Sequence, residues 1–299
     1  MFPELPEILS IYVITYNRAA KLVQTLQDLV ASPLRNCNIT VFDNCSTDDT
    51  QAEFHRHFGA SATIRCIRNP VNIGAAANTI LPSINSTTEY TWVLCDDDFL
   101  DFTNIADVVA ALQSNTFDLI MVGGHSEDIR IGAGLSGTPR EVMRTGVNYY
   151  RDTSFLPSTI YRTSFAKRYI ATCYSYCHFM YPQMAWAFGA VSSGASVYIS
   201  KHRLVTASIG TQSYSSAQQL GWWFDLSEQL EDKQDRKVML TSQWRGPLDQ
   251  TGLYGAINTT IRLKRFKLTL ILIGAFKTAV AASIIRMLKA RAYGIMHGN

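Results

Sequence analysis

An apolar stretch that ends in three adjacent carboxylates constrains this sequence most. Residues Tyr90 to Cys95 are apolar, aromatic or β-branched and contain neither Gly nor Pro, which predicts a strand buried on both faces. Asp96, Asp97 and Asp98 follow at once. Unpaired carboxylates are costly to bury, and adjacent ones repel each other. The stretch therefore predicts a cation at the end of a core strand, and its oxygen ligands favour Mg²⁺ or Mn²⁺.

Two alternatives stay open for these aspartates. They could form a solvated turn before the next helix, because helix N-termini favour Asp. The pair that would hold the ion is also open, although strand alternation points Asp96 and Asp98 one way and Asp97 the other. We therefore take Asp96 and Asp98 as the expected metal ligands.

Strands and helices alternate over the first 124 residues. Short runs rich in apolar and β-branched residues predict strands at 8–15, 38–42, 63–67, 90–95 and 118–122. Segments with helical signals lie between them, with Asn17 as the expected cap of the first helix and Ser46 or Thr47 as that of the second. This order predicts an α/β fold with a mostly parallel sheet and flanking helices.

Polar clusters follow three of these strands, at 15–18, 43–46 and 96–98. Ligands of parallel sheets bind beyond the carboxyl ends of the strands, so the clusters predict one shared binding site. No G-x-G-x-x-G follows the first strand, and G-x-x-x-x-G-K-[ST] does not occur. A dinucleotide oxidoreductase and a P-loop NTPase are therefore disfavoured.

The alternation of predicted strands and helices ends after Gly124. The Gly-rich segment 126–145 predicts a mobile loop over the site. Residues 149–189 are crowded with aromatic side chains, which suit sugar platforms and a helical core alike. Segments 195–200 and 203–208 are expected to pair as strands, and 219–230 to form an amphipathic helix.

Composition and cysteine spacing indicate a folded protein of a reduced compartment. A hydrophobic content of 47% with 17% charged residues predicts a sizeable core. The N-terminus lacks the basic and apolar run of a signal peptide, and the six cysteines show no paired spacing, which favours a reduced, cytoplasmic compartment. Cys173 and Cys177 could share a helix face, but without a second ligand pair a zinc site is disfavoured.

The C-terminal segment is strongly basic. Eight of the twenty-seven basic residues and none of the acidic residues lie beyond Asp249, which leaves the first 249 residues with a net charge of about −5. Residues 261–293 alternate basic clusters with apolar runs, the longest uncharged run being nine residues, too short to span a bilayer. We expect basic amphipathic helices on an anionic membrane surface. Packing on the body or a homo-oligomer contact is the alternative, and nucleic-acid binding is disfavoured.

Four motifs in order resemble those of family-2 glycosyltransferases with the GT-A fold. They are Thr-Tyr-Asn-Arg at 15–18, Val-Phe-Asp-Asn-Cys-Ser-Thr-Asp at 41–48, Asn-Ile-Gly at 72–74 with Asn78, and Trp-Val-Leu-Cys-Asp-Asp-Asp at 92–98. The last motif is similar to that of O-antigen and abequosyltransferase-like bacterial members. The resemblance implies a nucleotide-sugar-binding half at 1–124, an acceptor-binding half at 125–250 and a basic tail at 251–299.

The resemblance also implies roles for individual residues. Asp43 would accept hydrogen bonds from the nucleotide base, and Asp96 to Asp98 would bind ribose and the metal ion, with Asp97 and Asp98 as the metal pair if the motif is aligned on Phe99-Leu100. The remaining positions would line the nucleotide, phosphate and sugar pocket; they are Thr15, Tyr16, Asn17, Arg18, Asn72, Gly74 and Asn78.

The sequence departs from the family at the general base. Inverting members carry an acid at a helix start in the acceptor half, whereas residues 177–183 here read Cys-His-Phe-Met-Tyr-Pro-Gln. His178 is the candidate base. Asp225, Glu228 and His125 are more remote candidates, and the inverting or retaining outcome is left open.

The expected protein is thus a metal-dependent glycosyltransferase at the inner face of the cytoplasmic membrane. It would move a sugar from a nucleotide-sugar to a saccharide or lipid-linked saccharide in bacterial surface polysaccharide synthesis. A catalytically inactive GT-A scaffold and a sugar nucleotidyltransferase are the alternatives. The sequence names neither the donor sugar, the nucleotide base, the acceptor nor the linkage.

Overall fold

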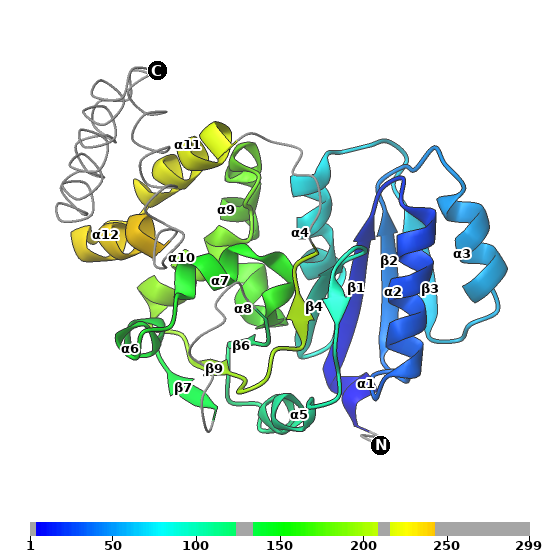
Figure 1. Cartoon of the computed structure of the whole chain (residues 1–299), viewed down its shortest axis with the longest axis horizontal. Coiled ribbons are helices and arrows are strands. Elements are labelled where there is room, and N and C mark those ends of the chain that lie inside the picture. Colours follow the sequence, from blue (N-terminus) through cyan, green and yellow to red (C-terminus); the bar gives the residue numbers. More distant parts are fainter. Residues whose placement is uncertain (1–3, 124–133, 209–215, 243–299) are drawn as a thin grey trace, which may run out of the picture. The chain divides into compact units, whose positions relative to one another are not determined.

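The computed structural model describes residues 4–123, 134–208 and 216–242. The chain divides into two compact units, Met1–Gly210 and Thr211–Asn299. The first contains, in order, the following elements (Figure 1): α1 (Leu5–Ile8), β1 (Leu9–Thr15), α2 (Ala19–Ala31), β2 (Asn38–Asp43), α3 (Thr50–Phe58), β3 (Ile64–Arg68), α4 (Ala75–Asn85), β4 (Tyr90–Cys95), β5 (Phe99–Leu100), α5 (Ala106–Gln113), β6 (Leu119–Met121), β7 (Leu135–Gly137), α6 (Pro139–Arg144), α7 (Tyr149–Ser154), η1 (Leu156–Ser158), β8 (Thr159–Arg162), α8 (Thr163–Arg168), α9 (Ile170–Ser175), η2 (Cys177–Phe179), α10 (Met184–Ser193), β9 (Val197–Ile199) and β10 (Val205–Thr206).

An eight-stranded sheet organises the first unit, with the strand order β3-β2-β1-β4-β8-β6-β9-β7. Strand β1 lies parallel to β2 and β4, and β2 lies parallel to β3. Strand β8 enters between β4 and β6 and runs antiparallel to both. The predicted α/β class with a mostly parallel sheet is confirmed. Both predicted halves supply strands to this one sheet, and the boundary between them at residue 124 stays a prediction.

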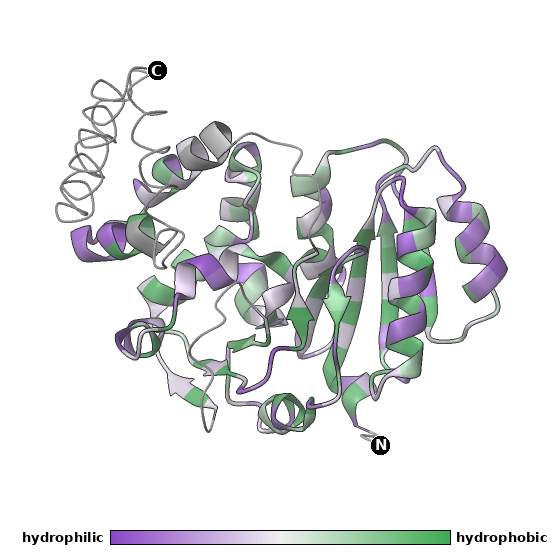
Figure 2. Cartoon of the chain, in the orientation of Figure 1, coloured by the Kyte–Doolittle hydropathy of each residue, from purple (hydrophilic) through white to green (hydrophobic). Residues whose placement is uncertain are grey.

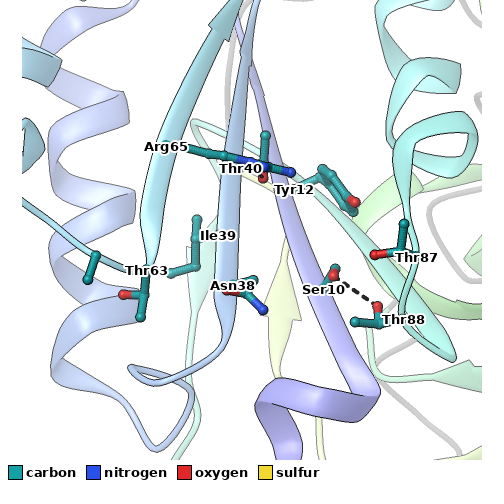
Figure 3. A pocket seen from close by; sticks show the side chains of 10 residues that line it. Ser10, Tyr12, Asn38, Ile39, Thr40, Thr63, Arg65, Thr87 and Thr88 are labelled. Carbon is teal, nitrogen blue, oxygen red and sulfur yellow. Dashed lines mark hydrogen bonds between the residues drawn. The ribbon is translucent and has the colours of Figure 1, made fainter.

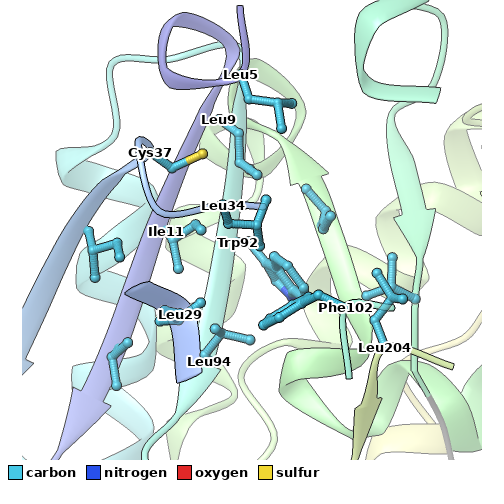
Figure 4. Packing of buried hydrophobic residues seen from close by; sticks show 14 of the residues in the cluster. Leu5, Leu9, Ile11, Leu29, Leu34, Cys37, Trp92, Leu94, Phe102 and Leu204 are labelled. Carbon is cyan, nitrogen blue, oxygen red and sulfur yellow. The ribbon is translucent and has the colours of Figure 1, made fainter. Parts of the chain in front are cut away.

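Helices cover the sheet through apolar stripes. Leu22, Leu26 and Leu29 of α2 recur at helical spacing and are fully buried in one core cluster with Ile11 and other strand residues. Figure 4 shows this packing around Trp92, and Figure 2 shows apolar residues along the strands with hydrophilic ones on α2 and α3. Helices α2 and α3 lie side by side (Figure 1). Burial of these stripes is what fixes β1 and β4, whose ends carry the polar clusters.

Two predictions for the later chain were wrong. Segments 195–200 and 203–208 do not pair with each other, because β9 pairs with β6 and β7 while β10 pairs with β5 in a separate two-stranded sheet. The expected loop at 126–145 contains two regular elements among its described residues, β7 and α6. Thr138 and Glu141 form a capping box at the start of α6, a signal that the Thr-Pro-x-Glu sequence contains.

The aromatic residues of 149–189 mostly form core. Tyr149, Tyr150, Tyr161, Phe165 and Trp186 are all fully buried. The Tyr149 hydroxyl donates to the Ala187 carbonyl at 3.0 Å, and the Trp186 indole donates to that of Ala166 at 3.1 Å. Of the two interpretations left open, the helical core therefore holds for these side chains.

The second unit contains α11 (Ser216–Ser227) and α12 (Lys233–Ser242). Helix α11 matches the helix predicted at 219–230. Trp223 is buried, and its indole donates to the Met239 carbonyl at 3.0 Å. Within 4–123, 134–208 and 216–242, no helix has both the length and the apolar character that a bilayer crossing requires. The basic segment 261–293 lies outside the described residues.

Trp92 offers a test of this core. It is fully buried on β4, and its ring centroid lies 6.1 Å from that of Phe102 in an edge-on arrangement. Its indole N–H donates to the Pro157 carbonyl at 2.9 Å. We expect Trp92→Ala to lower the free energy of unfolding by about 3–5 kcal/mol, and Trp92→Phe by about 1–3 kcal/mol. Urea denaturation followed by circular dichroism measures both. The half-exposed Val30→Ala is the control, and equal losses in all three variants would contradict this account.

Candidate functional site

Three polar loops meet where β1, β2 and β4 end. In the register of the sheet Thr15 lies opposite Asp43 of β2, and Ile14 lies opposite Cys95 of β4. Residue 15 is therefore flanked by Asp43 on one side and by Asp96 on the other. The reversal of strand order at β1 is the topological switch point where open α/β sheets bind ligands.

Asp96 is the most buried of the three consecutive aspartates, with 2% of its surface exposed. Its Oδ2 accepts a hydrogen bond from the Thr15 hydroxyl at 2.6 Å, and its Oδ1 accepts one from Arg18 Nη1 at 2.9 Å. The Thr25 hydroxyl donates to its carbonyl oxygen at 3.1 Å. Burial raises the pKa of Asp96, and the hydrogen bonds from Thr15 and Arg18 offset part of that rise.

Arg18 connects Asp96 to Asp97. The same Nη1 atom lies 2.8 Å from Asp97 Oδ2, and Lys21 Nζ lies 3.7 Å from that oxygen. Burial lowers the pKa of Arg18, but the hydrogen bond to Asp96 and the charges of both aspartates outweigh it and raise the pKa above its usual value. The guanidinium stays charged and neutralises this pair of carboxylates.

Asp98 is the least satisfied of the three. Its Oδ1 accepts from the Ser208 backbone N–H at 3.2 Å, and its buried Oδ2 has no hydrogen-bond partner among the described residues. Burial and the charges of Asp97 and Asp96 raise the pKa of Asp98 to about 6, despite hydrogen bonds from the Ser208 N–H and the Cys95 side chain. A buried carboxylate oxygen without a hydrogen-bond partner is a candidate ligand for a cation.

Ligand atoms of Cys95, Asp97 and Asp98 lie within 4.8 Å of one another. Burial and the neighbouring aspartates raise the pKa of Cys95 well above its usual value. Its sulfur is a soft ligand, whereas the oxygens of Asp97 and Asp98 are hard ligands. Such a donor set fits Mg²⁺ or Mn²⁺. The cluster contains Asp97 and Asp98 but not Asp96, both of whose carboxylate oxygens accept hydrogen bonds, from Thr15 and Arg18. Which two aspartates bind the ion stays a prediction.

Asp43 is fully buried at the end of β2. Its Oδ1 accepts from the backbone and hydroxyl of Ser46, at 2.9 and 2.5 Å. Its Oδ2 accepts from Gln51 at 2.7 Å and lies 3.5 Å from Arg68 Nε. Binding a nucleotide base here would require Gln51 or Arg68 to give up its place, and the base-binding role stays a prediction.

Asn17 does not cap α2, contrary to expectation. It adopts a left-handed conformation with φ 53°, and Arg18 takes the N-cap position without a side-chain cap. The Asn17 backbone N–H donates to the Ser46 hydroxyl at 2.8 Å, and its side-chain oxygen accepts from the Thr47 N–H at 2.7 Å. Asn17 thus ties the β1 loop to the β2 loop. Neither Ser46 nor Thr47 caps α3, contrary to expectation, because the N-cap position is Asp49. Tyr16 beside it is 42% exposed.

An amide network shapes the loop before α4. Asn44 donates to Asn72 Oδ1 at 2.9 Å, and the same oxygen accepts from the Gly74 N–H at 2.9 Å. Asn69 donates to Asn44 at 3.1 Å and to Asn78 at 2.9 Å. Gly74 has φ 85°, which favours glycine. Asn72 and Gly74 thus lie at the site by virtue of Asn44 and Asn69, which sequence reasoning missed although each directly follows a strand.

A comparison with protein-family models decides the assignment. The model described as Glycosyl transferase family 2 matches residues 10–183, more than half of the chain. The chain belongs to glycosyl transferase family 2. Among curated proteins none matches this sequence.

Solved structures of other proteins share the fold. S. aureus TarS 1-349 in complex with UDP-GlcNAc is 15% identical, with 91% of this chain and 81% of that chain covered and a TM-score of 0.63. The mannosyltransferase PcManGT from Pyrobaculum calidifontis, in complex with GDP-Man and Mn²⁺, is 12% identical, with 96% and 80% covered and a TM-score of 0.59. At these identities the likeness shows the fold alone, and it confirms the predicted GT-A fold.

The candidate bases of this family-2 protein belong to different parts of the chain. His178 is exposed on η2, and its ring lies 3.7 Å from that of Phe179. Asp225 and Glu228 belong to the second unit, and His125 lies outside the described residues. A catalytic role for His178 stays a prediction.

A hollow lies at the other end of the strands (Figure 3). It measures about 280 Å³ and is lined by residues from the first halves of β1 and β2, including Ser10, Tyr12 and Thr40. Arg65 Nε donates to the Thr40 hydroxyl across it at 2.9 Å. Because the carboxylates follow the opposite ends of these strands, this hollow is separate from the candidate site.

The raised pKa of Asp98 predicts a pH-dependent stability. Its folded-state pKa of about 6 exceeds that of an unfolded aspartate, about 3.9. Ionisation therefore costs more in the folded protein, and stability falls as the pH rises between those values. Without divalent ions, we expect Asp98→Asn to be about 1–2 kcal/mol more stable than the wild type near pH 7.5, with the difference vanishing near pH 4.

Urea denaturation in EDTA measures this difference. The control is Asp101→Asn, because the hydrogen bond from Thr103 lowers the pKa of Asp101, so that this substitution should slightly destabilise the protein at neutral pH. An Asp98→Asn protein that gains no stability at neutral pH would contradict the burial of this charge.

Proposed function

We propose that this protein transfers a sugar from a nucleotide-sugar to a saccharide acceptor in a reaction that depends on Mn²⁺ or Mg²⁺. The observation that carries the proposal is the pairing of Asp97 with Asp98 at the end of β4, where a buried oxygen of Asp98 lacks a partner among the described residues. TarS and PcManGT support the donor class, because their structures contain UDP-GlcNAc and GDP-Man.

Different residues would have different roles at this site. Asp97 and Asp98 would hold the ion, which would supply Lewis-acid stabilisation of the charge that develops on the departing nucleoside diphosphate. Arg18 and Lys21 add positive charge on the same side of Asp97. Asp43 would accept from the nucleotide base, and Asn72 and Gly74 would shape the sugar side of the pocket.

The acceptor is proposed to be a lipid-linked saccharide of bacterial surface polysaccharide synthesis. Support comes from the resemblance of the motif at 92–98 to O-antigen and abequosyltransferase-like members and from the basic, apolar composition of 261–293. A lipid-linked acceptor gives a membrane-surface tail a purpose, because both reactants then meet at the inner face of the membrane.

A catalytically inactive scaffold is the second candidate. It is favoured by the lack of an acidic residue at 177–183 and by the exposed position of His178. Such a scaffold would bind a nucleotide-sugar with metal and turn it over no faster than water does.

Nucleotide binding tests the proposed site. We expect one of UDP, GDP, CDP and dTDP to raise the melting temperature, and only with Mn²⁺. A ligand at about 100 times its Kd stabilises the folded state by about 2.7 kcal/mol. Asp97→Asn and Asp98→Asn should each remove the Mn²⁺-dependent part of the shift, whereas the exposed Asp101→Asn should retain it.

Unchanged shifts in both variants would remove Asp97 and Asp98 from the metal site. No shift with any nucleotide would overturn the nucleotide-sugar proposal. Release of nucleoside diphosphate from the matching nucleotide-sugar then separates an active transferase from the scaffold.

Vesicle binding tests the proposed tail. Because anionic headgroups attract clusters of Lys and Arg, with about 1 kcal/mol for each residue near the surface, deletion of 261–299 should release the protein from phosphatidylglycerol vesicles. Sedimentation measures the bound fraction, with neutral phosphatidylcholine vesicles as the control. A truncated protein that still sediments with anionic vesicles would contradict the tail as the membrane anchor.

A further inference from the structure

A single nitrogen of Arg18 holds two carboxylates at once. Its Nη1 lies 2.9 Å from Asp96 Oδ1 and 2.8 Å from Asp97 Oδ2. Charge-assisted contacts of this length are among the stronger polar interactions in proteins. Arg18 is therefore the principal counter-ion of this pair, with Lys21 a more distant second at 3.7 Å from Asp97 alone.

The backbone around Arg18 is fixed, whereas the side chain has room to move. Its N–H donates to the Thr50 hydroxyl at 3.3 Å, and the preceding Asn17 is bound to Ser46 and Thr47. The Arg18 side chain is nevertheless 46% exposed. A change of rotamer can thus move the guanidinium without disturbing the loop that carries it.

Most of the hydrogen-bonding capacity of Arg18 is unused. A guanidinium has five N–H donors, and the contacts of Arg18 with described residues all pass through Nη1. Its Nε and Nη2 groups make no hydrogen bond to the described part of the chain. These donors suit the paired oxygens of a diphosphate.

Asp97 faces two competing cations. Its side chain is 19% exposed and contacts Arg18, and its ligand oxygen also belongs to the cluster with Asp98 and Cys95. A divalent ion between Asp97 and Asp98 would approach the guanidinium closely, and the two positive charges would repel each other. Binding of either cation therefore weakens the hold of the other on Asp97.

We infer that Arg18 is an exchangeable counter-ion, which neutralises Asp97 until a metal ion and nucleotide bind and then passes to the diphosphate. The competition between Arg18 and the metal ion requires only the carboxylates, whereas the transfer of Arg18 to the diphosphate rests on the proposed function. The Asp96 carboxylate keeps the hydrogen bond from the Thr15 hydroxyl, of 2.6 Å, before and after Arg18 moves. Arg18 is thus a positioning residue for the metal ligand Asp97 before it contacts the donor.

Mn²⁺ binding without nucleotide provides the first test. Removal of the competing charge should tighten binding, so Arg18→Gln should bind Mn²⁺ roughly fivefold more tightly than the wild type, the equivalent of one exposed ion pair. Electron paramagnetic resonance of free Mn²⁺ measures this affinity in the full chain. Lys21→Gln, which removes a positive charge farther from Asp97, is the matched control and should change the affinity less than about twofold.

Nucleotide binding provides the second test, with the opposite sign expected. In saturating Mn²⁺, Arg18→Gln should bind the nucleoside diphosphate that stabilises the wild type roughly tenfold more weakly, because the diphosphate loses a charge-assisted partner. Isothermal titration calorimetry measures it. Arg18→Lys keeps the charge but not the fork of donors, so it should bind Mn²⁺ like the wild type and nucleotide more weakly.

The outcomes separate this inference from the proposed function. Mn²⁺ binding that is unchanged or weaker in Arg18→Gln overturns the competition, as does a failure of both proteins to bind Mn²⁺. Tighter Mn²⁺ binding with no nucleotide bound by the wild type supports the competition and removes the nucleotide-sugar function. If Arg18→Gln loses the wild-type circular dichroism spectrum, the Arg18→Lys variant takes its place in the nucleotide test. A nucleotide affinity of Arg18→Lys equal to that of the wild type overturns the transfer of Arg18 to the diphosphate.

Discussion

The buried charge of Asp96 is the constraint on which this site depends. A carboxylate that is 2% exposed at the end of a core strand requires donors from the structure itself. The register of β1 against β4 brings Thr15 beside it, and the turn after β1 returns Arg18 to its second oxygen. Displacing either strand by one residue would leave the charge without partners, so the sheet and the site stabilise the same register.

The loops of the site hold one another through short polar side chains. Asn17 binds Ser46 and Thr47, and Arg18 binds Thr50, which joins the loop after β1 to the loop after β2. Asn44 and Asn69 then join the β2 loop to the segment before α4. Because these contacts run between loops, they hold the backbone of the site in one arrangement.

Much of this architecture follows from local sequence patterns. The strands through β4, and the polar residues that end them, are predictable because apolar runs, helix periodicity and the carboxyl-end rule act over short distances. The partners of each aspartate were not predictable, because they depend on the left-handed turn at Asn17 and on the rotamer of Arg18. The entry of β8 between β4 and β6, and the separation of β9 from β10, depend on pairings distant in sequence.

The charges of the site also explain why a mobile cation is useful there. Arg18 and Lys21 contact two of the three carboxylates, Asp96 and Asp97. The third, Asp98, has a buried oxygen that lacks a partner among the described residues, so the cluster keeps a negative excess there. A divalent ion and the diphosphate of a nucleotide-sugar nearly cancel in charge. Their arrival would therefore redistribute the charge of the site while its sum stays nearly constant. A residue fixed on Asp97 would oppose that redistribution, whereas the half-exposed Arg18 permits it.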